Sequence, residues 1–181
     1  MKPYVKIILA VVLTFTLLIA HNRFAAALDV GDKAPDFELE STSGGKFKLS
    51  DLKGKNVLLN FYMLDFNPIC VKGLQASASN NYLLFKSENT EVAGISTNVT
   101  FSQKAFVDIA KINFPLLSDR NGKVMREYGV YDESRRLAKR AYVIVDKDGV
   151  VRYINIRPTY TEKDLLSTEE LLTEVRKVNK R

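Results

Sequence analysis

The sequence predicts one α/β domain, a sandwich in which helices flank a central mixed β-sheet that begins with a small β-hairpin. Runs of β-forming residues alternate with amphipathic segments of helical spacing along the chain. The run at 57–62 is apolar almost throughout, as expected of a central strand covered on both faces. The chain closes with a further hairpin and a helix. No repeat or linker interrupts this pattern, so residues 28–181 are predicted to form a single domain.

The N-terminal segment is set apart from this domain. Lys2 and Lys6 precede an apolar run at 7–20, and small residues follow at 25–27. This pattern is typical of a secretory signal peptide cleaved after Ala27. The run is short for a membrane span, which needs about 20 residues, but an uncleaved membrane tether is the alternative. Both interpretations predict an extracytoplasmic domain that is secreted, periplasmic or anchored facing outside.

The first half of the domain begins with a hairpin formed by 37–39 and 47–49 around a Gly-Gly turn. The central strand at 57–62 leads into a loop at 63–69 that contains a proline, and a helix is expected to begin near Cys70. Four apolar residues of this helix are spaced so that they lie on one face: Leu74, Ala78, Tyr82 and Phe85.

The second half continues the alternation. A strand at 92–96 is followed by a helix at 102–110, a short strand at 116–117 and a short helix at 124–128 ended by Gly129. The apolar face of the 102–110 helix is predicted from four residues: Phe101, Ala105, Phe106 and Ile109. The strands at 141–145 and 150–156 form a hairpin through an Asp-Gly turn. The closing helix at 167–180 presents four apolar residues: Leu171, Leu172, Val175 and Val178.

Composition excludes several kinds of site. The only histidine, His21, lies in the N-terminal segment, so the domain has no Cys-His couple and no ordinary zinc site, and we predict neither a metal nor a cofactor. Without residues 1–27 the chain has 24 basic and 21 acidic residues, a net charge of +3. The one cluster of like charge lies at 135–140, which is too little to predict nucleic-acid binding.

Cys70 is the only cysteine, which excludes an internal disulfide and a Cys-x-x-Cys redox pair. It is predicted to lie in the first turn of a helix, where the helix dipole and free backbone N–H groups favour a thiolate. Lys72 is expected to add positive charge nearby. Strand, loop, reactive cysteine and helix is the arrangement of thioredoxin-fold redox proteins. A buried cysteine that acts only as a small apolar residue is the alternative.

From Gly31 to about Val178 the chain resembles the peroxiredoxins, the family of alkyl hydroperoxide reductase and thiol-specific antioxidant proteins. The motifs that carry the resemblance are GDKAPDF at 31–37, LSDLKGK at 49–55, NFY at 60–62, FPLLSD at 114–119, YGV at 128–130 and RAYVIVD at 140–146. Each motif alone is weak, but together they stand in the family's order and spacing. The resemblance implies a thioredoxin-like sandwich and a thiol-dependent peroxidase.

The resemblance also implies the site. Cys70 would attack the peroxide as a thiolate, and Arg140 would supply fixed positive charge. Without the resemblance, the sequence favours a solvated surface position for Arg140. The family's proline seven residues before the cysteine is Met63 here, and its threonine three residues before is Asn67. The acidic residue often found three residues after the cysteine is Gly73. An amide replaces only part of what a hydroxyl does, since the hydroxyl donates and accepts at once. We therefore expect the peroxidase activity to be weakened but not lost.

The predicted catalytic residues are therefore Cys70, Arg140 and Asn67, and the predicted substrate-binding residues are Met63 and Pro68. With no second cysteine, the family's one-cysteine mechanism is implied, in which an external thiol or a thioredoxin-like protein reduces the oxidised Cys70. Peroxide would be the substrate. Dimers are common in the family, and the sequence leaves open whether this chain forms a homodimer.

Two other functions stay open. One is a thiol-disulfide oxidoreductase of the membrane-anchored thioredoxin-like kind, which the lack of a Cys-x-x-Cys pair argues against. The other is a degenerate peroxiredoxin retained as a binding module, for which the missing proline and threonine are the evidence. The binding module predicts a buried Cys70 that is indifferent to peroxide.

Overall fold

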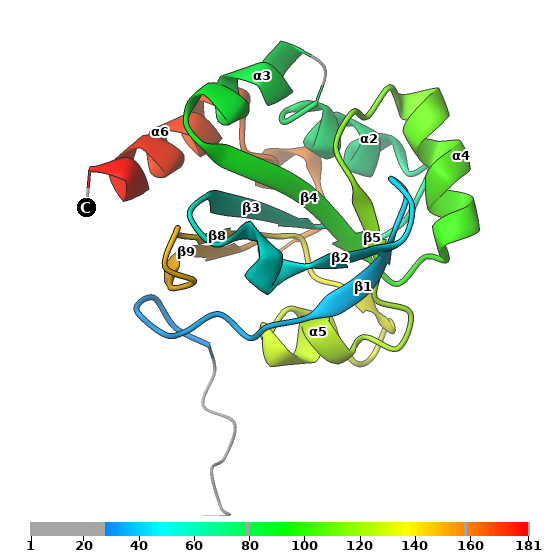
Figure 1. Cartoon of the computed structure of the whole chain (residues 1–181). Helices are drawn as coiled ribbons and strands as arrows, with labels where there is room; N and C mark the ends of the chain where they lie inside the picture. The colour runs from blue at the N-terminus through cyan, green and yellow to red at the C-terminus, as the bar shows by residue number, and fades with distance from the viewer. Residues whose placement is uncertain (1–27, 79, 158, 181) are drawn as a thin grey trace, which may run out of the picture.

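The computed structural model describes residues 28–78, 80–157 and 159–180, and a seven-stranded mixed sheet forms its centre (Figure 1). The strands are β1 (Glu38–Ser41), β2 (Lys46–Lys48), β3 (Asn56–Phe61), β4 (Thr90–Ser96), β5 (Leu116–Ser118), β8 (Ala141–Val145) and β9 (Val151–Ile156). Their order in the sheet is β2-β1-β5-β4-β3-β8-β9. Strands β3, β4 and β5 are parallel, and the other pairings are antiparallel. The predicted mixed sheet and its N-terminal hairpin are confirmed.

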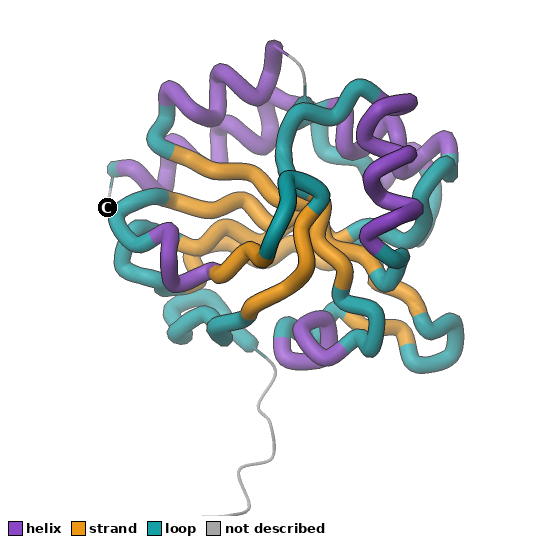
Figure 2. The backbone as a smooth tube through the Cα atoms, turned by 45° about the vertical axis from the view of Figure 1, so that its right-hand side comes forward, coloured by secondary structure: helices purple, strands orange, loops and turns teal. Residues whose placement is uncertain are grey.

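Helices flank the sheet on both sides (Figures 1 and 2). One face packs against α2 (Pro68–Gln75), α3 (Asn80–Ser87), α4 (Thr100–Ala110) and α6 (Thr168–Asn179). The other face packs against α5 (Lys123–Glu127) and the 3-10 helix η1 (Leu49–Leu52). A second 3-10 helix, η2 (Glu162–Asp164), precedes α6, and β6 (Tyr131–Asp132) pairs with β7 (Leu137–Ala138) in a separate hairpin that the sequence pattern did not predict.

Strand β3 is the centre of the core, with all six residues buried. Side chains alternate between the two faces of a strand, so Leu58 joins the core beneath α2 while Leu59 and Phe61 join the core on the side of α5. The strand therefore contributes to both layers, which explains its nearly continuous apolar sequence. At its carboxyl end, β3 is followed by the loop that precedes α2.

The predicted single helix through residue 85 is wrong, because α2 ends at Gln75 and α3 begins at Asn80. The Ser77 N–H donates to the Leu74 carbonyl and the Ala78 N–H to the Gln75 carbonyl, in the tight turns that end the helix. Serine and asparagine, which compete with the helical backbone for hydrogen bonds, crowd this stretch. The spacing still brings both helices to one core, since Leu74 and Phe85 are buried together.

The predicted apolar face of α4 is also partly wrong. Of the four predicted residues, Phe106 is buried, whereas Ala105 is exposed and Phe101 and Ile109 are 86% and 70% exposed. The cause is Gln103, which is fully buried and donates from Nε2 to the Leu117 carbonyl (2.9 Å). This polar anchor turns the helix away from the orientation that apolar spacing favours.

The predicted signal peptide or membrane tether at 1–27 lies outside the described residues. Within the described ranges, no helix is both long and apolar enough to cross a membrane.

Candidate active site around Cys70

Helix α2 places Cys70 in its first turn. Pro68 is the first helical residue, and Asn67 caps the helix through Oδ1, which accepts from the N–H groups of Ile69 (3.0 Å) and Cys70 (3.1 Å). Asparagine is among the best helix caps, and proline is favoured at the first position. The helix thus begins near Cys70 as predicted. The expectation of a free N–H at Cys70 is wrong, because Asn67 accepts it.

The Cys70 side chain is fully buried, and its sulfur faces one cation. Arg140 Nη2 lies 3.9 Å from Cys70 Sγ, and Arg140 is only 2% exposed. Arg140 directly precedes β8, whose residue Ala141 stands opposite Phe61 of β3, so the arginine lies at the carboxyl end of β3. A guanidinium is always protonated in proteins. The site therefore holds a permanent positive charge against the sulfur, and the interpretation of Arg140 as a solvated residue is wrong.

A small cavity of about 10 Å³ adjoins Arg140. Its lining residues are Asn60, Phe61, Tyr62, Gly73, Leu74, Arg140 and Tyr142. A Cβ atom on Gly73 would lie 2.8 Å from Leu165 Cδ2 and 3.0 Å from Arg140 Nη1, so a side chain there would displace the ends of these two side chains. Within the described ranges, Arg140 forms no ion pair with a carboxylate.

Tyr142 shares this cavity and responds to the same charge. Burial raises the pKa of Tyr142, while the hydrogen bond from the Leu166 N–H (3.3 Å) and the positive charge of Arg140 oppose the rise. The phenol is therefore neutral at physiological pH, and it offers Arg140 a polar neighbour without charge.

The loop before α2 is fixed by Asp65. Its Oδ1 accepts from the Tyr62 hydroxyl (2.9 Å) and from Asn98 Nδ2 (3.1 Å), and its Oδ2 accepts from the Ser102 hydroxyl (2.5 Å). Burial raises the pKa of Asp65, and these three hydrogen bonds oppose the rise. The carboxylate ties the loop to the start of α4 and so sets the position of Asn67.

The remaining predicted residues occupy different surroundings. Met63 is 8% exposed and lies in the same apolar core as Cys70. Pro68 is exposed at the start of α2. The Lys72 side chain is 63% exposed and its Nζ contacts Glu162 at 2.7 Å. Its charge is therefore paired at the surface, and an effect of Lys72 on Cys70 stays a prediction.

Sequence reasoning missed two polar residues beside Arg140, namely Asn60 and Tyr142. Both lie within strands whose apolar character marks them as core. They stand opposite each other in the β3–β8 pairing. The signal that could have found Asn60 is a single polar residue inside the buried run at 57–62, because buried polar groups need partners.

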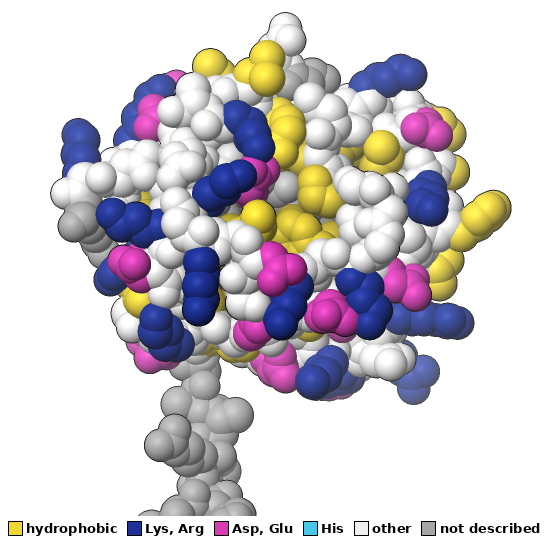
Figure 3. All heavy atoms as spheres, in the orientation of Figure 1, with side chains coloured by type: hydrophobic (Ala, Val, Ile, Leu, Met, Phe, Trp, Pro, Cys, Tyr) yellow, Lys and Arg dark blue, Asp and Glu magenta, His cyan; other side chains and the backbone are white. Residues whose placement is uncertain are grey.

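The basic cluster at 135–140 does not form one positive surface. Arg140 is buried, and Arg135 stacks on the Tyr160 ring (4.4 Å) and contacts Asp132. On the face in Figure 3, Lys and Arg side chains are interspersed with Asp and Glu side chains.

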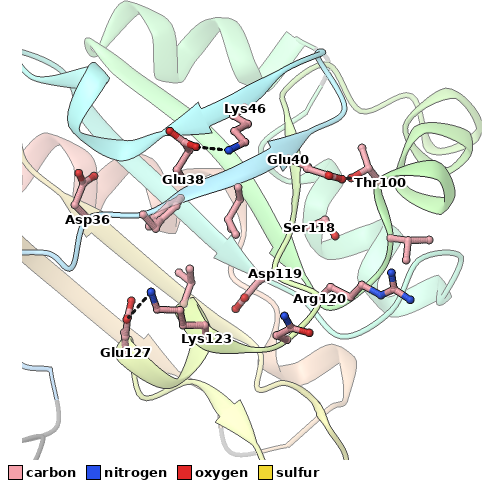
Figure 4. A pocket seen from close by; sticks show the side chains of 15 residues that line it. Asp36, Glu38, Glu40, Lys46, Thr100, Ser118, Asp119, Arg120, Lys123 and Glu127 are labelled. Atoms are coloured by element: carbon pink, nitrogen blue, oxygen red, sulfur yellow. Dashed lines mark hydrogen bonds and ion pairs between the residues drawn. The ribbon is translucent and has the colours of Figure 1, made fainter.

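A larger hollow of about 420 Å³ lies between β1, β5 and α5 (Figure 4). Its charged groups are largely paired: Lys46 with Glu38 (2.5 Å), Thr100 with Glu40 (2.8 Å) and Lys123 with Glu127 (3.9 Å). It shares no lining residue with the cavity beside Arg140 and contains no cysteine. Among the described residues there is also no cluster of His, Cys, Asp or Glu that could hold a metal ion. Cys70, beside Arg140, is the candidate reacting group among the described residues.

Comparisons with known proteins identify relatives of this chain in sequence and in structure. A family model described as AhpC/TSA family matches residues 30–154. The chain is 38% identical over 138 residues to the chloroplastic 2-Cys peroxiredoxin BAS1 of Spinacia oleracea, which covers 70% of this chain and 52% of that protein. It is 38% identical over 153 residues to the chloroplastic peroxiredoxin Q of Sedum lineare, covering 83% and 81%. The crystal structure of Enterococcus faecalis AhpC superposes with a TM-score of 0.75 at 28% identity, covering 84% and 92%. The chain spans about half the length of the first of these relatives.

Proposed function

Since this chain belongs to the AhpC/TSA family, the peroxiredoxins, and has their thioredoxin-like fold, we propose that it is a thiol-dependent peroxidase whose reacting group is Cys70. The observation that carries the proposal is the Arg140 guanidinium 3.9 Å from Cys70 Sγ in the buried core. A buried cation that forms no ion pair favours an anion beside it, and the Cys70 thiolate would be such an anion.

The reaction forms one bond and breaks one. The Cys70 thiolate attacks an oxygen of the peroxide, the S–O bond forms as the O–O bond breaks, and the leaving oxygen takes a proton to become water or an alcohol. Cys70 is left as a sulfenic acid. Negative charge spreads from sulfur to both oxygens in the transition state, so N–H donors of Arg140 aimed at these atoms lower the barrier.

Asn67 and Met63 modulate this step. The Asn67 carbonyl oxygen is engaged in capping α2, so its amide NH2 is the group we assign to the peroxide as a hydrogen-bond donor. Met63 and Pro68 would frame the approach to the sulfur. Because the family's threonine and proline are absent, we expect a lower rate than a peroxiredoxin with the full motif provides.

An external thiol completes the cycle. The chain has one cysteine, so a thiol from another molecule attacks the sulfenic sulfur, releases water and forms a mixed disulfide, which a second thiol then resolves. A thioredoxin-like protein or a small thiol suits this step. The N-terminal segment favours an extracytoplasmic site of action, with the chain secreted or tethered to a membrane. A homodimer is compatible with the family.

A second candidate is a peroxiredoxin fold kept as a binding module without catalysis. The observation that favours it is the complete burial of Cys70, together with a neighbouring cavity of only about 10 Å³. It predicts a thiol that alkylating reagents and peroxide reach slowly.

The test is steady-state consumption of hydrogen peroxide by the purified protein with dithiothreitol as the external thiol. The proposal predicts turnover that depends on protein concentration and disappears in Cys70→Ser, a change of one atom. Consumption no faster than that of dithiothreitol alone would reject the peroxidase and leave the binding module. Reduction of insulin disulfides by the same sample would instead support the thiol-disulfide oxidoreductase.

A further inference from the structure

Two buried polar atoms at the site lack a partner. Within the described ranges, Asn60 Oδ1 and Arg140 Nε are among four buried side-chain N or O atoms with no hydrogen bond. Asn60 and Arg140 are each 2% exposed. Buried polar groups in proteins are nearly always paired with protein or ordered water. One donor and one acceptor without partners at the same place therefore need an explanation.

Both residues line the same cavity beside Gly73. Its volume of about 10 Å³ is near the lower limit for one water molecule. A buried water needs two to four polar partners. Arg140 Nε is a donor, Asn60 Oδ1 is an acceptor, and Tyr142 also lines the space. The cavity thus has the size and the polar groups that a single water requires.

We propose that one ordered water occupies this cavity, accepts from Arg140 Nε and donates to Asn60 Oδ1, and that Asn60 is thereby a positioning residue for Arg140. The kinetic consequence rests on the proposed peroxidase function, but the water and the orientation of Arg140 do not.

The fold fixes Asn60 firmly enough for this role. It lies inside β3, between Gly94 of β4 and Tyr142 of β8, and its Nδ2 is 3.4 Å from the Ser77 hydroxyl. A guanidinium is a planar fork, so fixing Nε also fixes the direction of Nη2. The chain of contacts runs from Ser77 through Asn60 and the water to Arg140 and Cys70.

Gly73 explains why the guanidinium needs a partner from the sheet. Because residue 73 is a glycine, α2 offers no acidic side chain three positions after Cys70 that could orient Arg140. Asn60 approaches the guanidinium from the sheet instead, and the absence of a carboxylate partner leaves the positive charge of Arg140 for the sulfur.

The experiment compares Asn60→Leu with Asn56→Leu in the full chain. Asn56 is a matched control, because it is also a buried asparagine of β3, 3% exposed, but it pairs with Asn179 away from the site. The ultraviolet absorbance of the Cys70 thiolate at neutral pH is measured, together with the rate of thiol loss to hydrogen peroxide. Asn60→Leu is expected to lower the thiolate signal and to slow thiol loss about tenfold, the loss typical of a hydrogen bond to a charged group. Asn56→Leu is expected to change neither.

An unchanged thiolate signal in Asn60→Leu would overturn the proposal even if the protein proved to have no peroxidase activity. A high-resolution crystal structure of the reduced wild-type protein gives a readout that needs no variant to fold. It should contain one ordered water within hydrogen-bond distance of Asn60 Oδ1 and Arg140 Nε. An empty cavity, or direct contact between the two side chains, would overturn the proposal.

Discussion

Both ends of strand β3 have a buried asparagine with charged residues nearby, but the polar groups are paired at one end and partly unpaired at the other. At the amino end, Asn56 donates to Asn179 Oδ1 at 2.6 Å, and the neighbouring Glu91 of β4 holds Lys55 and Lys86 at 2.8 and 2.5 Å. At the carboxyl end, Asn60 and Arg140 each have a buried polar atom without a partner.

The difference separates stability from function. Paired groups at the amino end stabilise the fold, whereas the cation at the carboxyl end is left for Cys70. Ligands of open α/β sheets bind outside the carboxyl ends of the parallel strands, and the candidate site around Cys70 lies at that end of β3. Substitutions at the carboxyl end should therefore change thiol reactivity, and substitutions at the amino end should change stability alone.

The largest effect is expected at Arg140. Arg140→Ala should slow the reaction of Cys70 with peroxide by about 100-fold or more, as does the loss of a donor that stabilises transition-state charge. The measurement is the second-order rate of thiol loss in stoichiometric hydrogen peroxide. Arg152→Ala is the control, because Arg152 belongs to the same β8–β9 hairpin but pairs with Asp146 at 2.6 Å at its other end. Equal rates in both variants would contradict the assignment of Arg140.

Gly73 tests the packing around the guanidinium. In Gly73→Ala the new methyl group would press on Leu165 and Arg140, so we expect thiol reactivity to fall several-fold and stability to fall by about 1–3 kcal/mol. Gly94→Ala is equally crowded, with its Cβ 2.5 Å from Leu116 Cδ2, but it does not touch Arg140. Chemical denaturation should show both variants destabilised, with thiol reactivity reduced only in Gly73→Ala. Reduced reactivity in both would mean that general loosening of the core is the cause.

Substitutions of Asn67 should have smaller effects, one on stability and one on peroxide consumption. Asn67→Ala removes the cap of α2 and should cost about 1 kcal/mol of stability. Asn67→Thr keeps a capping oxygen and adds a hydroxyl that both donates and accepts, so a few-fold gain in peroxide consumption is expected. No gain in the threonine variant would show that the asparagine already serves the reaction.

Glu91 should have no effect on the thiol but a measurable one on stability. Burial raises the pKa of Glu91, but hydrogen bonds from Lys55, Lys86 and Tyr82 outweigh it and lower the pKa from 4.5 to about 2. A carboxyl whose pKa is lower in the folded state stabilises the fold above its unfolded value, and this contribution is lost as pH falls from 4.5 towards 2.

Allowing for solvent screening, the loss should be about 1 kcal/mol. Urea unfolding across this pH range should show it in the wild type and a weaker dependence in Glu91→Gln. If the free energy of unfolding depends on pH equally in both proteins, other carboxyl groups cause the dependence.

Much of this arrangement could be predicted from the sequence. Local signals were sufficient for the strands of the seven-stranded sheet, for the hairpin through Asp148-Gly149 and for α6, whose four predicted apolar residues are all buried. The family resemblance singled out Cys70 and Arg140, which are 70 positions apart in the chain and lie 3.9 Å apart in the fold.

The rest depended on contacts between distant segments. Buried Gln103 sets the rotation of α4 through the Leu117 carbonyl, and apolar spacing carries no information about that bond. The cavity beside Arg140 exists because β3, β8 and α2 meet there with a glycine on the helix. Neither Asn60 nor Gly73 reveals this role until the three elements are assembled.

The most direct test of the central claim is the fate of the single thiol. The reduced protein is mixed with one equivalent of hydrogen peroxide in the presence of dimedone, and the rate and the site of modification are followed by mass spectrometry. The account predicts oxidation far faster than that of a free thiol and a dimedone adduct on Cys70. Oxidation no faster than that of a free thiol would contradict it, and would mean that the buried cysteine of this peroxiredoxin fold is not a peroxidase.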